Sequence, residues 1–542
     1  MREFAERRKD FKKGLDSDAC RRGRTETSVR IRKDKKTDSL AKRRNMTLAI
    51  ADNPTITGSG DSMNDASGVK HVKRVYTVED IPYLMTTLRN SNGSMDLALE
   101  AVQGFRRMLS IADNPPVQPI LDCGALPIFV QLLQCADDRI KFEAAWALTN
   151  VASSDYTPAV VDVGAVPSLV ELLMCANSDV REQSAWCLGN IAGDSPTLRD
   201  YLLQAWALGP LLKNITQPAT KSLLGNCVWT LSNFCRGKPQ VDLDLIRPAI
   251  PVLAELLISS EDEGDVLIDV CWALSYLSDG DENRIQAVID AGVTASLINF
   301  LSGDDIRKIT PALRTLGNFV SGSDVQTQSV VDGGALKSLV TTLDSSKKNI
   351  RKESCWLLSN IAAGNHNQIN TLVSNHEIMK RVISAATSAE WEVRKEAAWV
   401  CSNIATGGLD IHAEILVHHG GLKALCGMLE SSDTKIILVV LEAMEKVLQM
   451  GEKLGHPYPA HIDEYGGLEQ IEKLQEHENE EIYNKCVEMI ETYFEGEEVD
   501  NENIAPSIQD NGFKFGVPQA KNLEKQLDAA SETNPQKFNF SF

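Results

Sequence analysis

A tryptophan followed four residues later by an asparagine recurs along this chain of 542 residues. The two residues share one face of a helix, because side chains four apart are neighbours there. An asparagine amide both donates and accepts hydrogen bonds, and an indole face attracts cationic side chains. The pattern therefore predicts repeated binding chemistry. The complete pairs are Trp146/Asn150, Trp186/Asn190, Trp229/Asn233, Trp356/Asn360 and Trp399/Asn403.

Two further positions keep the register but change one residue each. Trp272 is followed by Tyr276 and Arg314 by Asn318, so successive first positions lie 40–43 residues apart. We call these seven pairs the Trp/Asn ladder. A lone helical Trp would be assigned to the core, but aliphatic residues such as Leu148 already supply a core stripe. A buried, unpaired Asn costs about 1–3 kcal/mol, and an apolar core does not tolerate Arg314. The ladder is therefore predicted to line a continuous groove.

An extended, Lys/Arg-rich peptide is the ligand that this groove would bind. Asparagine amides can clamp a peptide main chain irrespective of its sequence, and indole rings can form slots for lysine and arginine stems. Carboxylates in register with the ladder would then select cations, although each one alone has the pattern of a solvated surface acid. These carboxylates are Asp194, Asp269, Asp324, Glu353 and Glu396.

The elements that position the ladder repeat with the same period. Copies open with a Gly-Ala or Gly-Gly turn and an aliphatic helix, for example at Gly124, Gly164 and Gly334, and continue into the Trp-bearing helix. Glycine ends the preceding helix and proline fits the first turn of the next. A fixed period just above 40 indicates one solenoid of stacked units. We expect an all-α, right-handed superhelical solenoid of about ten armadillo repeats.

Charge and composition divide the chain into four segments. Residues 1–45 carry a net charge of +9, which leaves −29 for the rest because the whole chain carries −20. We expect a basic arm over 1–50, a flexible linker rich in Gly, Ser and Asn over 51–75, the solenoid over 76–500 and a disordered tail over 501–542. The tail contains short phenylalanine clusters. The basic arm contains Lys42-Arg43-Arg44, which is itself a ligand of the predicted kind.

Composition also excludes several classes of function. An acidic body repels nucleic acid, and no apolar run approaches the ~18 residues of a membrane span. The twelve cysteines lack disulfide or zinc spacing and are expected to be buried thiols in a reducing compartment. No nucleotide-binding, metalloprotease or serine-hydrolase motif is present, so neither catalysis nor a cofactor is predicted. His418 and His419 precede a Gly-Gly turn and are expected to be surface residues, not ligands.

Three features resemble importin-α, the adaptor family of nuclear protein import. They are the blocks around Trp186, Trp229 and Trp272, the basic arm over residues 7–45, and the order of arm, linker and repeats. The resemblance covers almost the whole chain. It implies that the arm binds importin-β and otherwise occupies the groove through Lys42, Arg43 and Arg44. Because the arm is tethered, its effective concentration at the groove would be of order millimolar.

The resemblance also assigns the groove residues to two cargo sites for nuclear localisation signals. Asp194 would pair with the key lysine, and the minor site would serve bipartite signals. The major site would contain Trp146, Asn150, Gln183, Trp186, Asn190, Asp194, Trp229, Asn233, Asp269, Trp272 and Tyr276. The minor site would contain Arg314, Asn318, Asp324, Glu353, Trp356, Asn360, Glu396, Trp399 and Asn403.

Further partners follow from the same resemblance. The last repeats and the acidic stretch near 464–503 would contact an export receptor with Ran-GTP, and nucleoporins form a further class of partner. The protein would shuttle between cytoplasm and nucleus. Two departures from the family pattern stand out. The segment after Asn150 is about two residues short, so Thr157 is left out of the predicted site. The arm begins almost at Met1, which leaves the natural start of the chain open.

The main alternative is an armadillo scaffold of the adhesion or signalling kind, which grips acidic segments in a basic groove. The acidic body, the repeated asparagines and the basic arm all argue against it. Direct binding of nucleic acid by the arm is disfavoured by the same acidic body.

Overall fold

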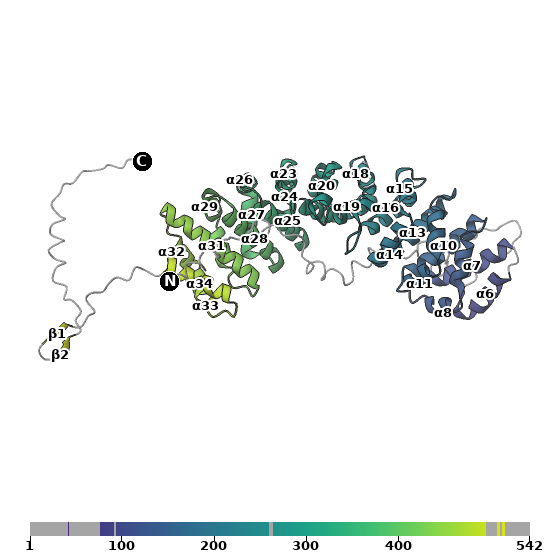
Figure 1. Ribbon diagram of the computed structural model, residues 1–542, viewed down its shortest axis with the longest axis horizontal. Helices are drawn as coiled ribbons and strands as arrows, with labels where there is room; N and C mark the ends of the chain where they lie inside the picture. The colour runs from purple at the N-terminus through teal and green to yellow at the C-terminus, as the bar shows by residue number, and fades with distance from the viewer. Residues whose placement is uncertain are drawn as a thin grey trace, which may run out of the picture. The chain divides into compact units, whose positions relative to one another are not determined.

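The computed structural model describes Lys42 and residues 76–90, 94–259, 264–494, 507–509 and 512–514. The chain divides into two compact units, residues 1–456 and 457–542, and each is described by itself. Helices form every regular element between residues 78 and 493 (Figure 1). The prediction of an all-α repeat solenoid is confirmed. Among the described residues, no helix combines the length and apolar character that a membrane span requires.

Within the described residues, the first unit begins with a short 3-10 helix and two α-helices, and eight triplets of helices follow. The opening elements are η1 (Val78–Asp80), α6 (Ile81–Arg89) and α7 (Met95–Leu109). The triplets are α8 (Val117–Asp122), α9 (Ala125–Leu132) and α10 (Asp138–Ala152); α11 (Thr157–Asp162), α12 (Ala165–Leu172) and α13 (Ser178–Asp194); α14 (Pro196–Gln204), α15 (Leu208–Thr216) and α16 (Lys221–Cys235); α17 (Leu243–Ile246), α18 (Ala249–Ser259) and α19 (Gly264–Leu277); α20 (Glu282–Asp290), α21 (Thr294–Leu301) and α22 (Ile306–Phe319); α23 (Asp324–Asp332), α24 (Ala335–Leu343) and α25 (Lys348–Ala362); α26 (His366–Val373), α27 (His376–Ser388) and α28 (Trp391–Gly407); and α29 (Asp410–His418), α30 (Gly421–Cys426) and α31 (Thr434–Leu454).

The predicted glycine turns separate the first and second helices of a triplet. Gly124 and Gly164 adopt φ angles of +74° and +79° directly before α9 and α12. A side chain is strained in this left-handed region, whereas glycine is not. The sharp turn lets the second helix fold back and bury its aliphatic side, for example Phe129 and Leu169.

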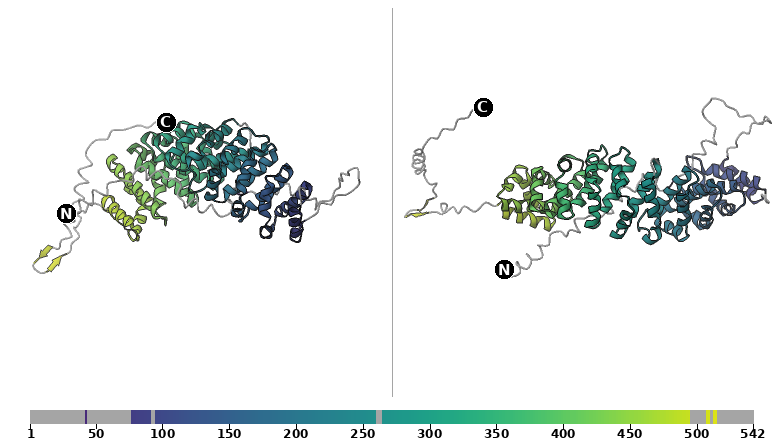
Figure 2. Two further views of the ribbon diagram at one scale, coloured as in Figure 1. Left: turned by 45° about the vertical axis from the view of Figure 1, so that its right-hand side comes forward. Right: turned by 90° about the horizontal axis from the view of Figure 1, so that it is seen from above.

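The third helices of successive triplets pack directly on one another from α7 through α31. The views in Figure 2 agree that the repeats follow each other in chain order. Every pair of the Trp/Asn ladder lies on one of these helices: α10, α13, α16, α19, α22, α25 and α28. The stacking therefore brings the ladder residues of neighbouring repeats beside one another.

Ladder asparagines join neighbouring repeats by hydrogen bonds. The side-chain amide nitrogen of Asn190 donates to the Thr149 carbonyl at 3.1 Å, and that of Asn233 donates to the Gly189 carbonyl at 3.0 Å. Asn403 donates to the Ser359 carbonyl at 2.8 Å. In each case the acceptor directly precedes the Asn of the previous repeat. The amides of these three buried asparagines thus have main-chain partners, so the expected penalty for an unpaired amide does not arise for them.

Small residues before the ladder Asn allow the next tryptophan to approach. A methyl group at Gly189 would overlap the ring of Trp229, and one at Gly317 would overlap the ring of Trp356. Both indoles are buried, at 0% and 7% exposure. Glycine at these two positions therefore sets how closely successive third helices pack.

A second set of hydrogen bonds joins the first helices of neighbouring triplets. The Gln326 amide nitrogen donates to the Glu282 carbonyl at 2.9 Å, and that of Gln368 donates to the Asp324 carbonyl at 2.8 Å. The buried Arg199 guanidinium on α14 donates to the Arg236 carbonyl at 2.7 Å and the Pro239 carbonyl at 2.9 Å, both in the segment that leads from α16 to α17 of the next triplet. The repeats are thus fixed in register along two separate lines.

The second unit holds one more triplet and a short ribbon. Its helices are α32 (Tyr458–Glu464), α33 (Gly467–Leu474) and α34 (Glu480–Tyr493), with Ile462, Ile471 and Met489 buried. Strands β1 (Ser507–Gln509) and β2 (Gly512–Lys514) pair antiparallel. This pair lies within the segment 501–542 that was predicted to be a disordered tail. The remaining tail residues lie outside the described ones.

Gly317→Ala tests the close approach of the third helices. The added methyl group has to displace the Trp356 ring, so we expect a loss of about 1–3 kcal/mol in the free energy of unfolding, as overpacked cores show. Chemical denaturation of the full-length chain measures it. Gly209→Ala is the matched control, because no atom lies within 4 Å of the added methyl group. Equal stability of the Gly317 variant and the control would contradict this packing constraint.

Candidate functional site

A lysine from the basic arm is bound at the end of α13. The Lys42 ammonium lies 2.6 Å from an Asp194 carboxylate oxygen, 2.9 Å from the Thr157 hydroxyl and 3.0 Å from the Ser154 carbonyl. An ammonium has three N–H donors, and each finds one acceptor. The Lys42 and Asp194 side chains retain 20% and 22% exposure. This site therefore combines one charge with two neutral acceptors at the protein surface.

Helix ends position all three acceptors. Asp194 is the last residue of α13, Ser154 lies in the turn after α10, and Thr157 is the first residue of α11. The Thr157 hydroxyl lies 2.8 Å from the Ala152 carbonyl and 2.9 Å from the Ser154 carbonyl; it donates its single hydrogen to one of them and accepts from Lys42. Carbonyl groups at a helix C-terminus lack intrahelical partners and favour cations. The site is thus preorganised by the turn that joins two repeats.

Thr157 and Ser154 were missed from the sequence. The short segment after Asn150 suggested that Thr157 had shifted, but α11 starts at Thr157 with Pro158 in its first turn. The start of this helix holds the hydroxyl beside the end of α10 despite the short loop. Proline at the second helical position was the available signal. The Ser154 contact is made by a carbonyl, which no residue type could have indicated.

The ladder tryptophans have little exposed surface in the full-length chain. Trp146, Trp229, Trp356 and Trp399 are buried, at 1%, 0%, 7% and 3% exposure, whereas Trp186 is half-buried. The tryptophan rings are therefore less exposed than a face that lines an open groove was expected to be. Two of these rings pack in part against the preceding repeat, Trp229 over Gly189 and Trp356 over Gly317.

Two arginines of the chain itself lie over ladder tryptophans. The Arg106 guanidinium lies 4.2 Å from the Trp146 ring centroid, and the Glu143 carboxylate holds it at 2.7 Å. The Arg314 guanidinium lies 5.7 Å from the Trp272 ring centroid. Both distances are within the range of cation–π attraction. Indole faces of this ladder are therefore compatible with cationic side chains.

Position 314 thus keeps its place in the ladder by stacking on its neighbour. Trp272 also stacks on Tyr276, with 5.8 Å between ring centroids. Asn318 donates to the Ser275 carbonyl at 3.0 Å and so retains the inter-repeat bond. The absence of Trp at position 314 and of Asn at position 276 changes the side chains that a ligand would meet here. The hydrogen bond between the neighbouring third helices is retained.

The ladder also extends one repeat further toward the N-terminus than predicted. Arg106 lies 40 residues before Trp146 on α7, and Ser110 lies 40 residues before Asn150. The Asn150 amide nitrogen donates to the Ser110 hydroxyl at 2.9 Å. This copy has neither the Trp nor the Asn of the ladder, so the spacing pattern did not include it.

The other predicted site residues differ in their surroundings. Gln183 is buried and donates to the Thr149 hydroxyl at 2.7 Å. Among the acidic residues, Asp269 and Glu353 are buried, Glu396 is half-buried and Asp324 is exposed at the start of α23. The structure brings the predicted minor-site residues together on the adjacent helices α22, α25 and α28, apart from Asp324, which follows α22. Arg43 and Arg44 lie outside the described residues.

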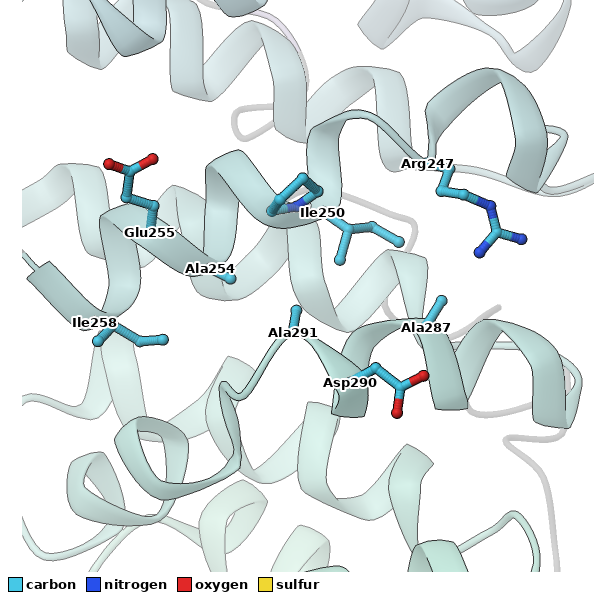
Figure 3. A pocket seen from close by; sticks show the side chains of 9 residues that line it. Arg247, Ile250, Ala254, Glu255, Ile258, Ala287, Asp290 and Ala291 are labelled. Atoms are coloured by element: carbon cyan, nitrogen blue, oxygen red, sulfur yellow. The ribbon is translucent and has the colours of Figure 1, made fainter.

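A separate hollow lies away from the ladder. Its volume is about 400 Å³, and it is lined by side chains of α18, α20 and their adjoining turns (Figure 3). Arg247 and Asp290 lie toward one end, and Glu255 and Ile258 toward the other. None of its lining residues belongs to a ladder helix, so it has no part in the cation site.

The cysteines provide no reactive group at the groove. Within the described residues none is disulfide-bonded, and no cluster of three or more metal-ligating side chains forms. Burial raises the pKa of Cys187, Cys227, Cys271 and Cys401 to about 12. These thiols are therefore protonated at neutral pH and pack as small apolar side chains.

Stacked three-helix repeats with a cation site along their third helices define the class of armadillo-repeat binding proteins. Residues 113–153, 153–193 and 323–363 match the family model “Armadillo/beta-catenin-like repeat”, and residues 456–507 match “Atypical Arm repeat”. Residues 7–103 match “Importin beta binding domain”. A solved structure of an engineered protein aligns over 76% of this chain and 98% of its own, with a TM-score of 0.68 and 29% identity.

Curated relatives identify the family. The chain is 42% identical over 525 residues to importin subunit alpha-1a of Oryza sativa subsp. japonica, covering 95% of this chain and 96% of that protein. It is 42% identical over 525 residues to importin subunit alpha-3 of Arabidopsis thaliana, covering 94% and 96%. This chain belongs to the importin-α family of nuclear import adaptors.

Thr157→Val tests the neutral half of the lysine site. Valine keeps the shape of the side chain but removes one acceptor from the bound ammonium, so we expect a loss of about 0.5–1.5 kcal/mol. That loss corresponds to roughly 2- to 12-fold weaker binding of a lysine-rich peptide to a chain lacking residues 1–70. Fluorescence anisotropy measures it. Thr216→Val, on an exposed part of α15, is the control. Unchanged affinity would remove Thr157 from the site.

Proposed function

We propose that the groove along the third helices binds Lys/Arg-rich nuclear localisation signals, with Asp194 selecting the key lysine. The observation that carries this proposal is the ammonium of Lys42, which is 2.6 Å from Asp194 and has two further acceptors. A lysine ammonium of an incoming signal offers the same three donors. The net negative charge of the repeat body attracts such a basic ligand at long range, before any direct contact forms.

The basic arm regulates access to this site. Lys42 and a cargo lysine require the same three acceptors, so their binding is mutually exclusive. Arg43 and Arg44 follow Lys42 in the sequence and, with it, form the basic cluster that acts as the internal ligand. Tethering gives the arm an effective concentration of order millimolar. Importin-β captures the arm, removes Lys42 from Asp194 and so couples its own binding to cargo loading.

The ladder acts as two cargo sites. Arg314 stacks on Trp272 and therefore covers part of the surface that an intact slot would offer at this position. This contact supports a division between the major site, Trp146 to Tyr276, and the minor site, Arg314 to Asn403. A signal with one basic cluster uses the major site, and a bipartite signal uses both.

The remaining roles follow from family membership. Helices α32–α34 and the acidic residues after them form the surface for the export receptor with Ran-GTP, within residues 464–503. Nucleoporins are further partners. The protein shuttles between cytoplasm and nucleus as a binding adaptor without a cofactor or catalytic activity, and it engages neither nucleic acid nor a membrane.

Removal of the arm tests both the groove and its regulation. A lysine-rich, single-cluster peptide is titrated into the full chain and into a chain lacking residues 1–70. We expect at least 10-fold tighter binding after truncation, because the tethered competitor is gone. Equal tight binding would retain the cargo site and overturn autoinhibition. Absence of binding to both chains would overturn the adaptor proposal.

Asp194→Lys in the truncated chain separates specific recognition from general acidity. This change places a second cation at the lysine site, and we expect it to abolish binding of the single-cluster peptide. Asp290→Lys makes the same change in net charge on α20, away from the ladder, and serves as the control. Equal losses in the two variants would indicate that overall charge alone attracts the peptide.

Trp356→Ala with Asn360→Ala tests the two-site arrangement. We expect the double variant to weaken bipartite peptides by at least 10-fold and single-cluster peptides by less than 3-fold, because only the former occupy the minor site. Trp391 lies on α28 outside the ladder and is 41% exposed, so Trp391→Ala is the matched control. Equal losses for the two peptide classes would contradict two separable sites.

A further inference from the structure

Two histidines from adjacent repeats face each other away from the ladder. The His376 Nδ1 and His419 Nε2 atoms are 3.1 Å apart, and the rings are nearly parallel at 21° with 5.3 Å between centroids. His376 is the first residue of α27, and His419 directly follows α29. His376 is exposed and His419 half-buried, so solvent reaches both rings. The pair thus forms a solvent-accessible N–H···N contact between two imidazole rings.

A main-chain contact determines the protonation of His419. Its Nδ1 atom lies 2.8 Å from the Ile415 carbonyl oxygen. A carbonyl only accepts hydrogen bonds, so Nδ1 carries the hydrogen and the neutral ring presents the Nε2 lone pair to His376. Metal-binding imidazoles commonly donate their second ring N–H to such a carbonyl, which orients the ring. His419 is therefore held in the tautomer that a metal ion requires.

We propose that His376 and His419 together bind one divalent transition-metal ion of the imidazole-preferring class, such as Zn²⁺ or Ni²⁺. Two nitrogens that bind Zn²⁺ tetrahedrally at 2.0–2.1 Å are separated by about 3.3 Å. The observed 3.1 Å is close to this value, but the 5.3 Å between ring centroids shows that the two nitrogens face each other nearly head-on, so both rings must turn for their lone pairs to converge on the ion. The proton on His376 moves from Nδ1 to Nε2 through solvent, and both rings stay neutral.

Water completes the coordination of the ion. No group of three ligating side chains forms within the described ranges, so two imidazoles are the protein ligands. The His418 ring, 5.9 Å from that of His419 between centroids, is the next imidazole. Sequence analysis placed His418 and His419 at the surface and excluded them as ligands. The surface position agrees with the structure, whereas the pairing of His419 with His376 could not be foreseen.

Such an ion would clamp two repeats together. His376 belongs to the triplet α26–α28, and His419 lies in the turn between α29 and α30 of the next triplet. Helices α27 and α30 pack against each other at this point. The ion would therefore stabilise the junction between two repeats at a place separate from the cargo ladder on the third helices.

Titration calorimetry of the metal-free, full-length chain with Ni²⁺ tests the site, because imidazole suits Ni²⁺ while thiols compete for Zn²⁺. We expect one site that is weakened at least 10-fold in both His376→Ala and His419→Ala. His366→Ala is the control, since His366 is the exposed first residue of α26. Equal binding by the wild type and both pair variants would overturn the proposal.

Thermal unfolding in the presence of Ni²⁺ provides an independent readout. An ion that binds only the folded chain raises the unfolding temperature, and we expect this increase in the wild type and in His366→Ala but not in the pair variants. Circular dichroism of the metal-free variants verifies their folding. A rise of the same size in all chains would assign binding to other groups and overturn the site.

Discussion

The spacing between successive third helices is the constraint on which the binding surface depends. It is set by an amide-to-carbonyl hydrogen bond at the ladder asparagines, such as Asn233 to Gly189, and by a small residue beneath the next tryptophan. Because the same contacts recur, the error in position from one repeat to the next stays small. A peptide with a regular backbone can only be read by side chains that are this regularly spaced.

The same asparagine can serve both the stack and a ligand. Its amide group has two N–H donors and an acceptor oxygen, and the bond to the preceding repeat uses one donor. The rigid stack therefore orients the group that contacts the peptide main chain in the proposed function. Burial of the ladder is consistent with this dual use, because an amide fixed by a neighbour loses little conformational freedom on binding.

The repeat architecture was predictable because its signals are local. The period, the glycine turns and the Trp/Asn spacing each act within a single repeat, and the structure confirms the solenoid that they predict. The contacts between repeats were not predictable in the same way. Asn190 donates to the Thr149 carbonyl, 41 positions earlier in the chain. Every residue has a main-chain carbonyl, so the residue types in the sequence do not indicate which one is the acceptor. The pairing of residues 507–509 with residues 512–514 was not predicted for a different reason, since each of the two strands has only three residues.

The candidate site shows the same division between local and tertiary signals. Asp194 could be named in advance because a carboxylate in register with the ladder has a single obvious partner class. Thr157 could not, because its contact depends on where α11 begins and on the turn after α10. The resemblance to importin-α supplied the grouping into two sites. The stacking of Arg314 on Trp272 offers a physical reason for the proposed boundary between them.

The lysine site combines specificity with ease of release. A partly exposed ion pair contributes only about 0.2–1 kcal/mol, so the contact of Lys42 with Asp194 cannot by itself hold a ligand tightly. Affinity must accumulate over several ladder positions, which favours long basic segments over isolated lysines. In the proposed function, the same modest strength lets the tethered arm compete with cargo and still be withdrawn by a partner. An adaptor that loads and unloads in each transport cycle needs this balance, and a fully buried pair would oppose it, because breaking such a pair leaves an uncompensated charge.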